Sequence, residues 1–162
     1  MIINRFRVDG SEILVEFTTG TKTLRLTTFH EPKAELFMQT ANVAAFGKSA
    51  LGIIAERAAF REIAFSHGDS PGTRLVYKIP TLHGENARLT CPRIDRGHIH
   101  NKNGDLVLDD PRTLYEDAVI LLEQLIEEFV RGERAQLALP FEGLDESEEP
   151  VDADQIREGV PA

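Results

Sequence analysis

The sequence has little of what stabilises a secreted or membrane-embedded protein. Cys91 is the one cysteine among 162 residues, so no internal disulfide can form and nothing favours an oxidising compartment. No apolar run approaches the roughly 20 residues that a membrane-spanning helix needs. The first residues lack the basic lead and apolar core of a signal peptide. We therefore expect a cytoplasmic protein with no membrane partner.

Aromatic residues are scarce, and several catalytic motifs are absent from the sequence. Tryptophan does not occur, so the core must consist mainly of aliphatic side chains and phenylalanine. There is no Gly-rich phosphate-binding loop and no Gly-x-Ser-x-Gly elbow. Cys91 lies in a predicted strand beside Pro92, which is typical of a buried thiol rather than a nucleophile. We expect no catalytic residue and no cofactor, and the sequence favours a binding protein over an enzyme.

The acidic residues are concentrated at one end of the chain. The net charge is −9, but residues 142–162 contain eight acidic residues and one basic residue, a net charge of −7. Residues 1–141 therefore carry only −2. Beyond about residue 144 the chain has two prolines and few apolar residues, so it cannot bury enough surface to fold. We predict a nearly neutral folded domain followed by a disordered acidic C-terminal tail.

Hydrophobic periodicity predicts an alternation of strands and helices. Strands are predicted at residues 2–8, 12–18, 22–29, 60–67, 73–80 and 86–92, and a small hairpin at 98–108. A helix is predicted at 32–46 with Pro32 in its first turn, and a second short helix at 49–58, because Gly47 and Gly52 weaken the continuation. The last helix is predicted at 111–131, with Asp110 as N-cap and Gly132 as the stop.

This order of elements is typical of an α+β fold. It is compatible with an antiparallel β-sheet covered by two main helices and equally with a small OB-like barrel covered by them. We predict an α+β domain at residues 1–132, a peptide segment at 133–143 and the acidic tail at 144–162.

The segment between the last helix and the tail resembles the peptide by which bacterial replication and repair proteins dock on the DNA sliding clamp. Gln136, Leu137, Leu139, Pro140 and Phe141 occupy the positions of that motif. An extended peptide of this kind places alternate apolar anchors in pockets, and the glutamine amide fixes its register by hydrogen bonds. The resemblance implies the clamp as a partner. The alternative is a final strand whose apolar side chains face the core.

A second candidate site is a basic stretch. Residues 72–104 carry six basic and two acidic residues, a local net charge of +4. The candidate nucleic-acid contacts are Arg74, Lys78, Arg88, Arg93 and Arg96. A groove that follows the backbone of single-stranded DNA needs such cations, with Tyr77 or histidine rings available to stack on bases. The alternative is an ordinary solvated sheet face, and Tyr77 falls on the face opposite Arg74 and Lys78.

Histidines form a third candidate site. His98 and His100 occupy alternate positions and could share a metal ion, with His83, Cys91 and Asp95 nearby. No Cys-x-x-Cys or His-Glu-x-x-His pattern accompanies them. The sequence therefore favours a histidine pair in a loop hairpin over a metal site.

The middle strands, the last helix and residues 132–137 together resemble small uncharacterised proteins from phage and prophage DNA-metabolism gene clusters. The resemblance implies a non-enzymatic accessory protein of replication or recombination, which binds single-stranded DNA or a replication protein and docks on the clamp. The acidic extension past Phe141 departs from it, and could compete with DNA for the basic stretch. Two alternatives are a phage-encoded inhibitor of a host protein, with the acidic tail as a DNA mimic, and a small metal-dependent enzyme centred on His83, His98 and His100.

Overall fold

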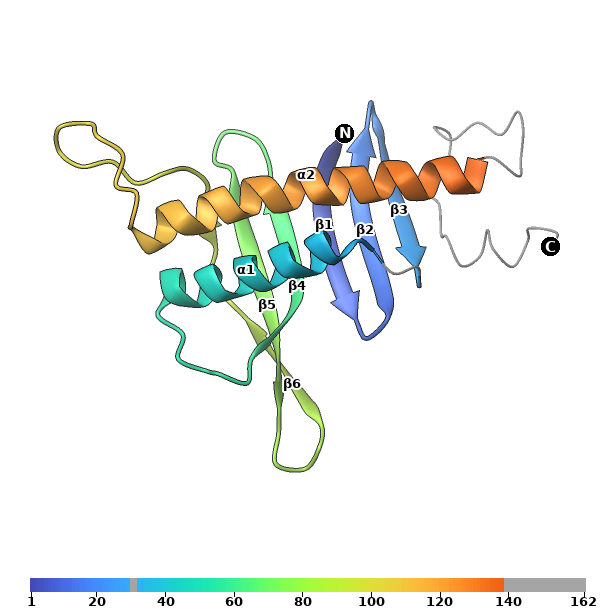
Figure 1. The fold of residues 1–162 in the computed structure, drawn as a ribbon, viewed down its shortest axis with the longest axis horizontal. Coiled ribbons are helices and arrows are strands. Elements are labelled where there is room, and N and C mark those ends of the chain that lie inside the picture. Colours follow the sequence, from blue (N-terminus) through green and yellow to red (C-terminus); the bar gives the residue numbers. More distant parts are fainter. Residues whose placement is uncertain (30–31, 139–162) are drawn as a thin grey trace.

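Two helices pack on one face of an antiparallel sheet (Figure 1). The computed structural model describes residues 1–29 and 32–138, the last six of them by their backbone only. The elements are β1 (Ile2–Asp9), β2 (Glu12–Thr19), β3 (Lys22–Thr28), α1 (Ala34–Leu51), β4 (Ala59–Ser66), β5 (Gly72–Pro80), β6 (Asn86–Thr90), β7 (Ile94–Asp95) and α2 (Pro111–Ala138). The predicted tail at 144–162 lies outside the described residues. Neither described helix combines the length and the hydropathy that a membrane span requires.

The strands follow the order β3-β2-β1-β4-β5-β6, and the short β7 also pairs with β5. All the pairings are antiparallel. The predicted α+β class is therefore confirmed in its helix-covered form. The described strands do not close into a barrel, because β3 and β6 end the order without pairing with each other.

The first three strands form the predicted meander. Asp9 pairs with Glu12 and Thr19 pairs with Lys22, so each connection is a two-residue turn. Gly10 and Gly20 each have a φ of +61°, which two-residue hairpin turns require and which glycine adopts without strain. Local turn chemistry thus fixes the register of β1, β2 and β3.

The core lies between the sheet and the two helices. Two fully buried tyrosines attach the helices to β5. The hydroxyl of Tyr77 donates a hydrogen bond of 2.7 Å to the carbonyl oxygen of Ala44 on α1. The hydroxyl of Tyr115 on α2 lies 2.7 Å from the hydroxyl of Thr73 on β5. Burial raises the pKa of both phenols above the ordinary range. Thr73 and Tyr77 of β5 therefore mark the helix-covered face of the sheet.

The prediction for the first helix was partly wrong. A single helix runs from Ala34 to Leu51, and residues 49–58 do not form a second one; Pro32 precedes the helix rather than opening it. Gly47 does not break α1, because its role is a close approach to the sheet. A Cβ at this position would collide with Leu75 and with the hydroxyl of Tyr77. Gly52, with a φ of +70°, ends the helix in the left-handed conformation.

The predicted start of α2 is confirmed, but its predicted end is wrong. The carboxylate of Asp110 accepts a hydrogen bond of 2.9 Å from the backbone N–H of Arg112. The helix continues through Gly132 to Ala138. A glycine costs a helix only about 1 kcal/mol relative to alanine, and the six residues after it are all good helix formers. In Figure 1, α2 crosses the sheet and extends past β3.

Candidate nucleic-acid interface

The face of the sheet that carries neither helix is rich in basic side chains. On β5, Thr73 and Tyr77 are buried beneath the helices, so Arg74 and Lys78 lie on the opposite face. The strand pairings extend this alternation to β1, β2, β3, β4 and β6. We call this surface the basic face, and its cations are Arg5, Arg7, Arg25, Arg74, Lys78, Arg88 and Arg93.

Five acidic residues share the basic face, namely Asp9, Glu12, Glu16, Glu62 and Asp95. Asp9 is ion-paired with Arg61, which lies at the irregularity of β4. With that pair counted as neutral, the seven cations and the other four anions give this surface a net charge of +3, in a chain whose total is −9. The fold thus collects positive charge that the overall composition conceals.

Two of these carboxylates lie among the arginines at the centre of the sheet. The Arg5 Nε lies 3.9 Å from Glu16 and 3.7 Å from Glu62, and Arg88 lies 3.8 Å from Glu62 on the other side. The Arg5 Nε is buried without a hydrogen-bond partner, so these contacts are ionic only. Long, partly exposed ion pairs of this kind contribute little to stability. The arginines therefore remain able to exchange partners.

Arg74 and Lys78 form no ion pair with any residue that the structure describes. Lys78 stands directly opposite Arg88 in the pairing of β5 with β6. The sequence placed Arg74 and Lys78 on one strand face with Arg88 beside them, and the structure brings these three together. The positive charges of Arg74 and Lys78 are the least neutralised on the basic face.

Arg93 lies on the same face but is engaged by the backbone. Its guanidinium group occupies the space above Gly72, where a Cβ would collide with it. It donates a hydrogen bond to the carbonyl oxygen of Ser70 and lies 3.4 Å from Asp95. Arg93 therefore holds the turn between β4 and β5 and contributes to the positive charge near Arg74.

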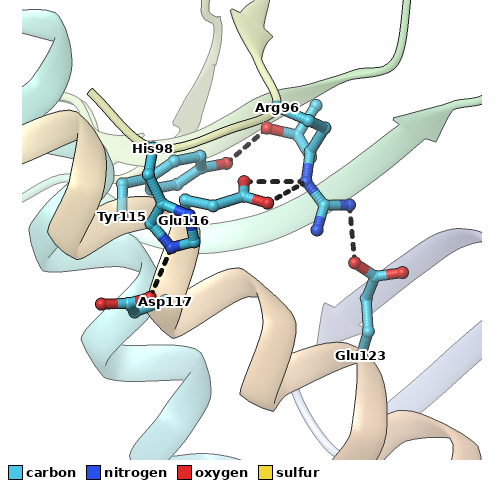
Figure 2. A network of polar contacts seen from close by, with 7 residues as sticks. Arg96, His98, Tyr115, Glu116, Asp117 and Glu123 are labelled. Carbon is cyan, nitrogen blue, oxygen red and sulfur yellow. Dashed lines mark hydrogen bonds and ion pairs between the residues drawn. The ribbon is translucent and has the colours of Figure 1, made fainter. Parts of the chain in front are cut away.

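The structure places Arg96 away from the basic face, against α2 (Figure 2). Its Nε donates a hydrogen bond of 2.8 Å to Glu116, and its Nη1 donates one of 2.6 Å to Glu123. Burial alone would lower the pKa of Arg96, but the bonds to these two carboxylates outweigh it and raise the pKa. Arg96 is a clasp between β7 and α2. The prediction that it belongs with the nucleic-acid contacts is not supported by this position.

Aromatic stacking, which the sequence suggested, is not available on the basic face. Tyr77 is fully buried and its hydroxyl is bound to α1. None of the paired strand positions on this face carries an aromatic or histidine side chain. Any nucleic acid bound there would be held through its phosphates.

The three candidate metal-binding histidines are not brought together. The His98 Nε2 lies 2.6 Å from the carboxylate of Asp117 on α2, as Figure 2 shows. His100 forms an isolated bridge with Leu106, and backbone hydrogen bonds on either side of it join the two arms of the predicted hairpin. His83 lies in the connection between β5 and β6. Within residues 1–29 and 32–138, no three His, Cys, Asp or Glu side chains are grouped so that they could hold a metal ion.

Cys91 is buried, and an apolar cavity lies beside α1. Cys91 is 3% exposed, and burial raises the pKa of its thiol. A cavity of about 510 Å³ opens between α1 and the strands β1 and β4, with Phe37, Lys48 and Phe60 in its wall. No carboxylate, histidine or cysteine lines it. The polar side chains in its wall are those of Lys48 and Thr40, and the Thr40 hydroxyl is engaged in a hydrogen bond within α1.

The sliding-clamp motif falls partly inside α2. Gln136 and Leu137 are in the last turn of that helix. Leu139, Pro140 and Phe141 lie outside the described residues. The motif was predicted as an extended peptide, so binding in that form requires the end of α2 to unwind.

No family model matches this chain, and no curated protein or solved structure matches it either. Its function is therefore inferred from the basic face and the surroundings of that face.

Proposed function

We propose that this protein is a non-enzymatic nucleic-acid-binding protein whose basic face contacts the phosphate backbone. The observation that carries the proposal is the gathering of seven cations on the helix-free face of an open sheet, with a net charge of +3. Sequence-independent binding of nucleic acids depends on such neutralisation of phosphates by lysine and arginine.

The type and spacing of the cations fit phosphate groups. Six of the seven are arginines, whose planar guanidinium groups bind phosphate oxygens through two parallel hydrogen bonds. Neighbouring strands lie about 4.8 Å apart, and residues on the same face of one strand lie about 6.8 Å apart. The basic face thus presents positive charges on β1, β3, β5 and β6 to a polyanion, with carboxylates of β2 and β4 between them.

The absence of aromatic side chains at the strand positions of the basic face favours binding through phosphates over binding by base stacking. Sheets that bind single-stranded RNA stack the bases on aromatic side chains of their open face. Here binding would follow phosphate density, and a duplex carries one charge per roughly 1.7 Å against roughly 3.4 Å for one strand. We therefore propose that duplex DNA binds at least as tightly as the single-stranded DNA expected from the sequence.

The cellular role that we propose is the one suggested by the sequence. The protein would act as an accessory factor of phage or prophage replication or recombination. Docking on the sliding clamp through residues 136–141 would bring the basic face to DNA. The two contacts are independent, so each can be tested without the other.

A salt series with a double variant tests the DNA contact. Replacing Arg74 and Lys78 by glutamine removes the two cations that form no ion pair with described residues. Loss of two phosphate contacts should flatten the plot of log affinity against log salt by about 1.8, since each contact contributes about 0.9. Fluorescence anisotropy with a labelled duplex measures this slope.

The matched control replaces Arg57 and Lys102 by glutamine. Both are exposed, lie in connections away from the basic face, and make the same change in net charge. This control should bind like the unaltered protein. The proposal fails if neither duplex nor single strand binds at low salt, or if the control loses as much affinity as the double variant.

A further inference from the structure

We infer that the acidic segment at residues 142–158 docks on the basic face of the same chain and competes there with phosphate. The competition rests on the proposed function, but the docking requires no nucleic acid. The two statements can therefore be tested separately. Three observations favour residues 142–158 as the group that binds the basic face.

The charges of the two surfaces are complementary. The segment from residue 142 onward carries a net charge of −7, whereas the basic face carries +3. Its acidic residues are Glu142, Asp145, Glu146, Glu148, Glu149, Asp152, Asp154 and Glu158. Arg74 and Lys78 have no acidic partner within the described residues, so both cations are available to bind the acidic segment.

The spacing of the acids also matches a sheet face. Six of the eight occupy even-numbered positions. In an extended chain, alternate side chains point the same way at intervals of about 6.8 Å. These six carboxylates would then share one side at intervals of two or four residues, which are also the intervals between Arg5 and Arg7 on β1 and between Arg74 and Lys78 on β5.

The chain leaves the described structure near the edge of the sheet. Figure 1 shows α2 crossing the sheet and extending past β3, the edge strand that carries Arg25. Residues 139–162 can span up to about 80 Å when extended, at about 3.3 Å per residue. Five strand spacings of about 4.8 Å amount to about 24 Å. The acidic segment therefore reaches every cation of the basic face after passing around β3.

Tethering makes even a weak contact effective. A short linker gives an effective concentration of about 1 mM, so a contact with a dissociation constant of about 0.3 mM keeps the face occupied for about three-quarters of the time. The apparent affinity for a competing nucleic acid then falls about four-fold. The docked segment would suppress weak binding of polyanions from solution. A DNA held close to the basic face, at a high local concentration, would displace the segment.

A full-length variant with a neutral segment tests the inference. All eight acids listed above are replaced by their amides, which keeps the length of the chain. At low salt this variant should bind a fluorescein-labelled duplex about four-fold more tightly than the unaltered protein, and the difference should narrow as salt rises. A control for net charge neutralises five exposed acids away from the basic face, namely Glu35, Glu56, Asp105, Asp109 and Glu128. It should show a smaller change, because these charges are not held against the basic face and are separated from it by more solvent.

A second readout needs no DNA. NMR spectra of the arginine Nε–Hε groups, recorded at low salt, should differ between the unaltered and neutral-segment proteins at Arg5, Arg74 and Arg88. Differences confined to another surface, or no differences, would overturn the docking even if DNA binds. Differences on the basic face without DNA binding would support the docking and refute the proposed function. Equal DNA affinity of both proteins would overturn the competition.

Discussion

Lys78 and Arg88 lie directly opposite each other on β5 and β6, on the face of the sheet that no helix covers. Like charges in directly opposed positions destabilise a sheet. Arg88 has a carboxylate at 3.8 Å, that of Glu62, whereas Lys78 has none among the described residues. A sheet selected for stability alone would place an acid opposite Arg88. The pairing therefore agrees with a surface that binds an anion.

Reversing one charge of this pair should separate stability from binding. Lys78→Glu creates a cross-strand ion pair with Arg88, so the free energy of unfolding should rise by about 0.2–1 kcal/mol. The affinity for duplex DNA should fall further than in Lys78→Gln, because a repulsive charge replaces an attractive one. Urea unfolding and anisotropy measure the two effects. Lys102→Glu makes the same reversal away from the face, and equal DNA affinity of the two variants would contradict the prediction.

The clasp between Arg96 and α2 predicts a large effect on stability. In Arg96→Gln, Glu116 loses its cation while its side chain is only 9% exposed. Removing one partner of a buried ion pair costs about 3 kcal/mol or more, because the remaining charge stays buried. Urea unfolding should show this loss. Adding Glu116→Gln to the same chain should recover part of it.

The same variant distinguishes a clasp from a nucleic-acid contact. Arg96 lies against α2 and not on the basic face. The folded Arg96→Gln protein should therefore keep its affinity for duplex DNA to within about two-fold, because one distant charge has only a small, screened effect. A ten-fold loss of duplex affinity in a variant that still folds would show that Arg96 contributes to nucleic-acid binding.

Most of the strands could be predicted from the sequence because their signals are local. Alternation of apolar and polar residues and the glycines at positions 10 and 20 were sufficient for the meander. The end of α1 could not be predicted in this way. From the sequence alone, Gly47 is expected to end the helix. The reason for a glycine there is its close approach to Leu75 and Tyr77, which are about 30 residues away in the chain.

The basic face was only partly visible in the sequence for the same reason. Arg74, Lys78 and Arg88 come from strands adjacent in the chain, so their grouping was predicted. Arg5 and Arg25 come from strands that meet this part of the sheet only through the pairing of β1 with β4. The alternation of Arg5 and Arg7 with Phe6 showed that they face away from the core. Their place on the same face as Arg74 depended on the strand order, which cannot be read from the sequence.

Alkaline pH should weaken the fold in a defined direction. Burial raises the pKa of Cys91 above its ordinary 9.0 and those of Tyr77 and Tyr115 above their ordinary 10.0. The unfolded chain therefore releases protons that the folded protein retains, and the free energy of unfolding falls as pH rises above about 9. The slope is at most about 1.4 kcal/mol per pH unit for each group. Urea unfolding between pH 8 and about 11 tests this, and Cys91→Ala should remove the earliest part of the decline.

The sliding-clamp motif can be tested by substitution of its anchor residues. Replacing Gln136, Leu139 and Phe141 by alanine should abolish binding to a bacterial sliding clamp without unfolding the domain. Loss of folding would instead show that these side chains contribute to the packing of the domain. Surface plasmon resonance on immobilised clamp measures the first outcome, and circular dichroism the second.

Loosening the end of α2 should have the opposite effect on clamp binding. Ala135→Gly and Ala138→Gly leave every motif residue in place but destabilise the last turn by about 1 kcal/mol each. If this turn must unwind before docking, each substitution should tighten clamp binding by up to about five-fold. Ala118→Gly, in the middle of the same helix, should weaken the fold without this gain. Unchanged or weaker clamp binding in the two end variants would show that the helical turn does not oppose docking.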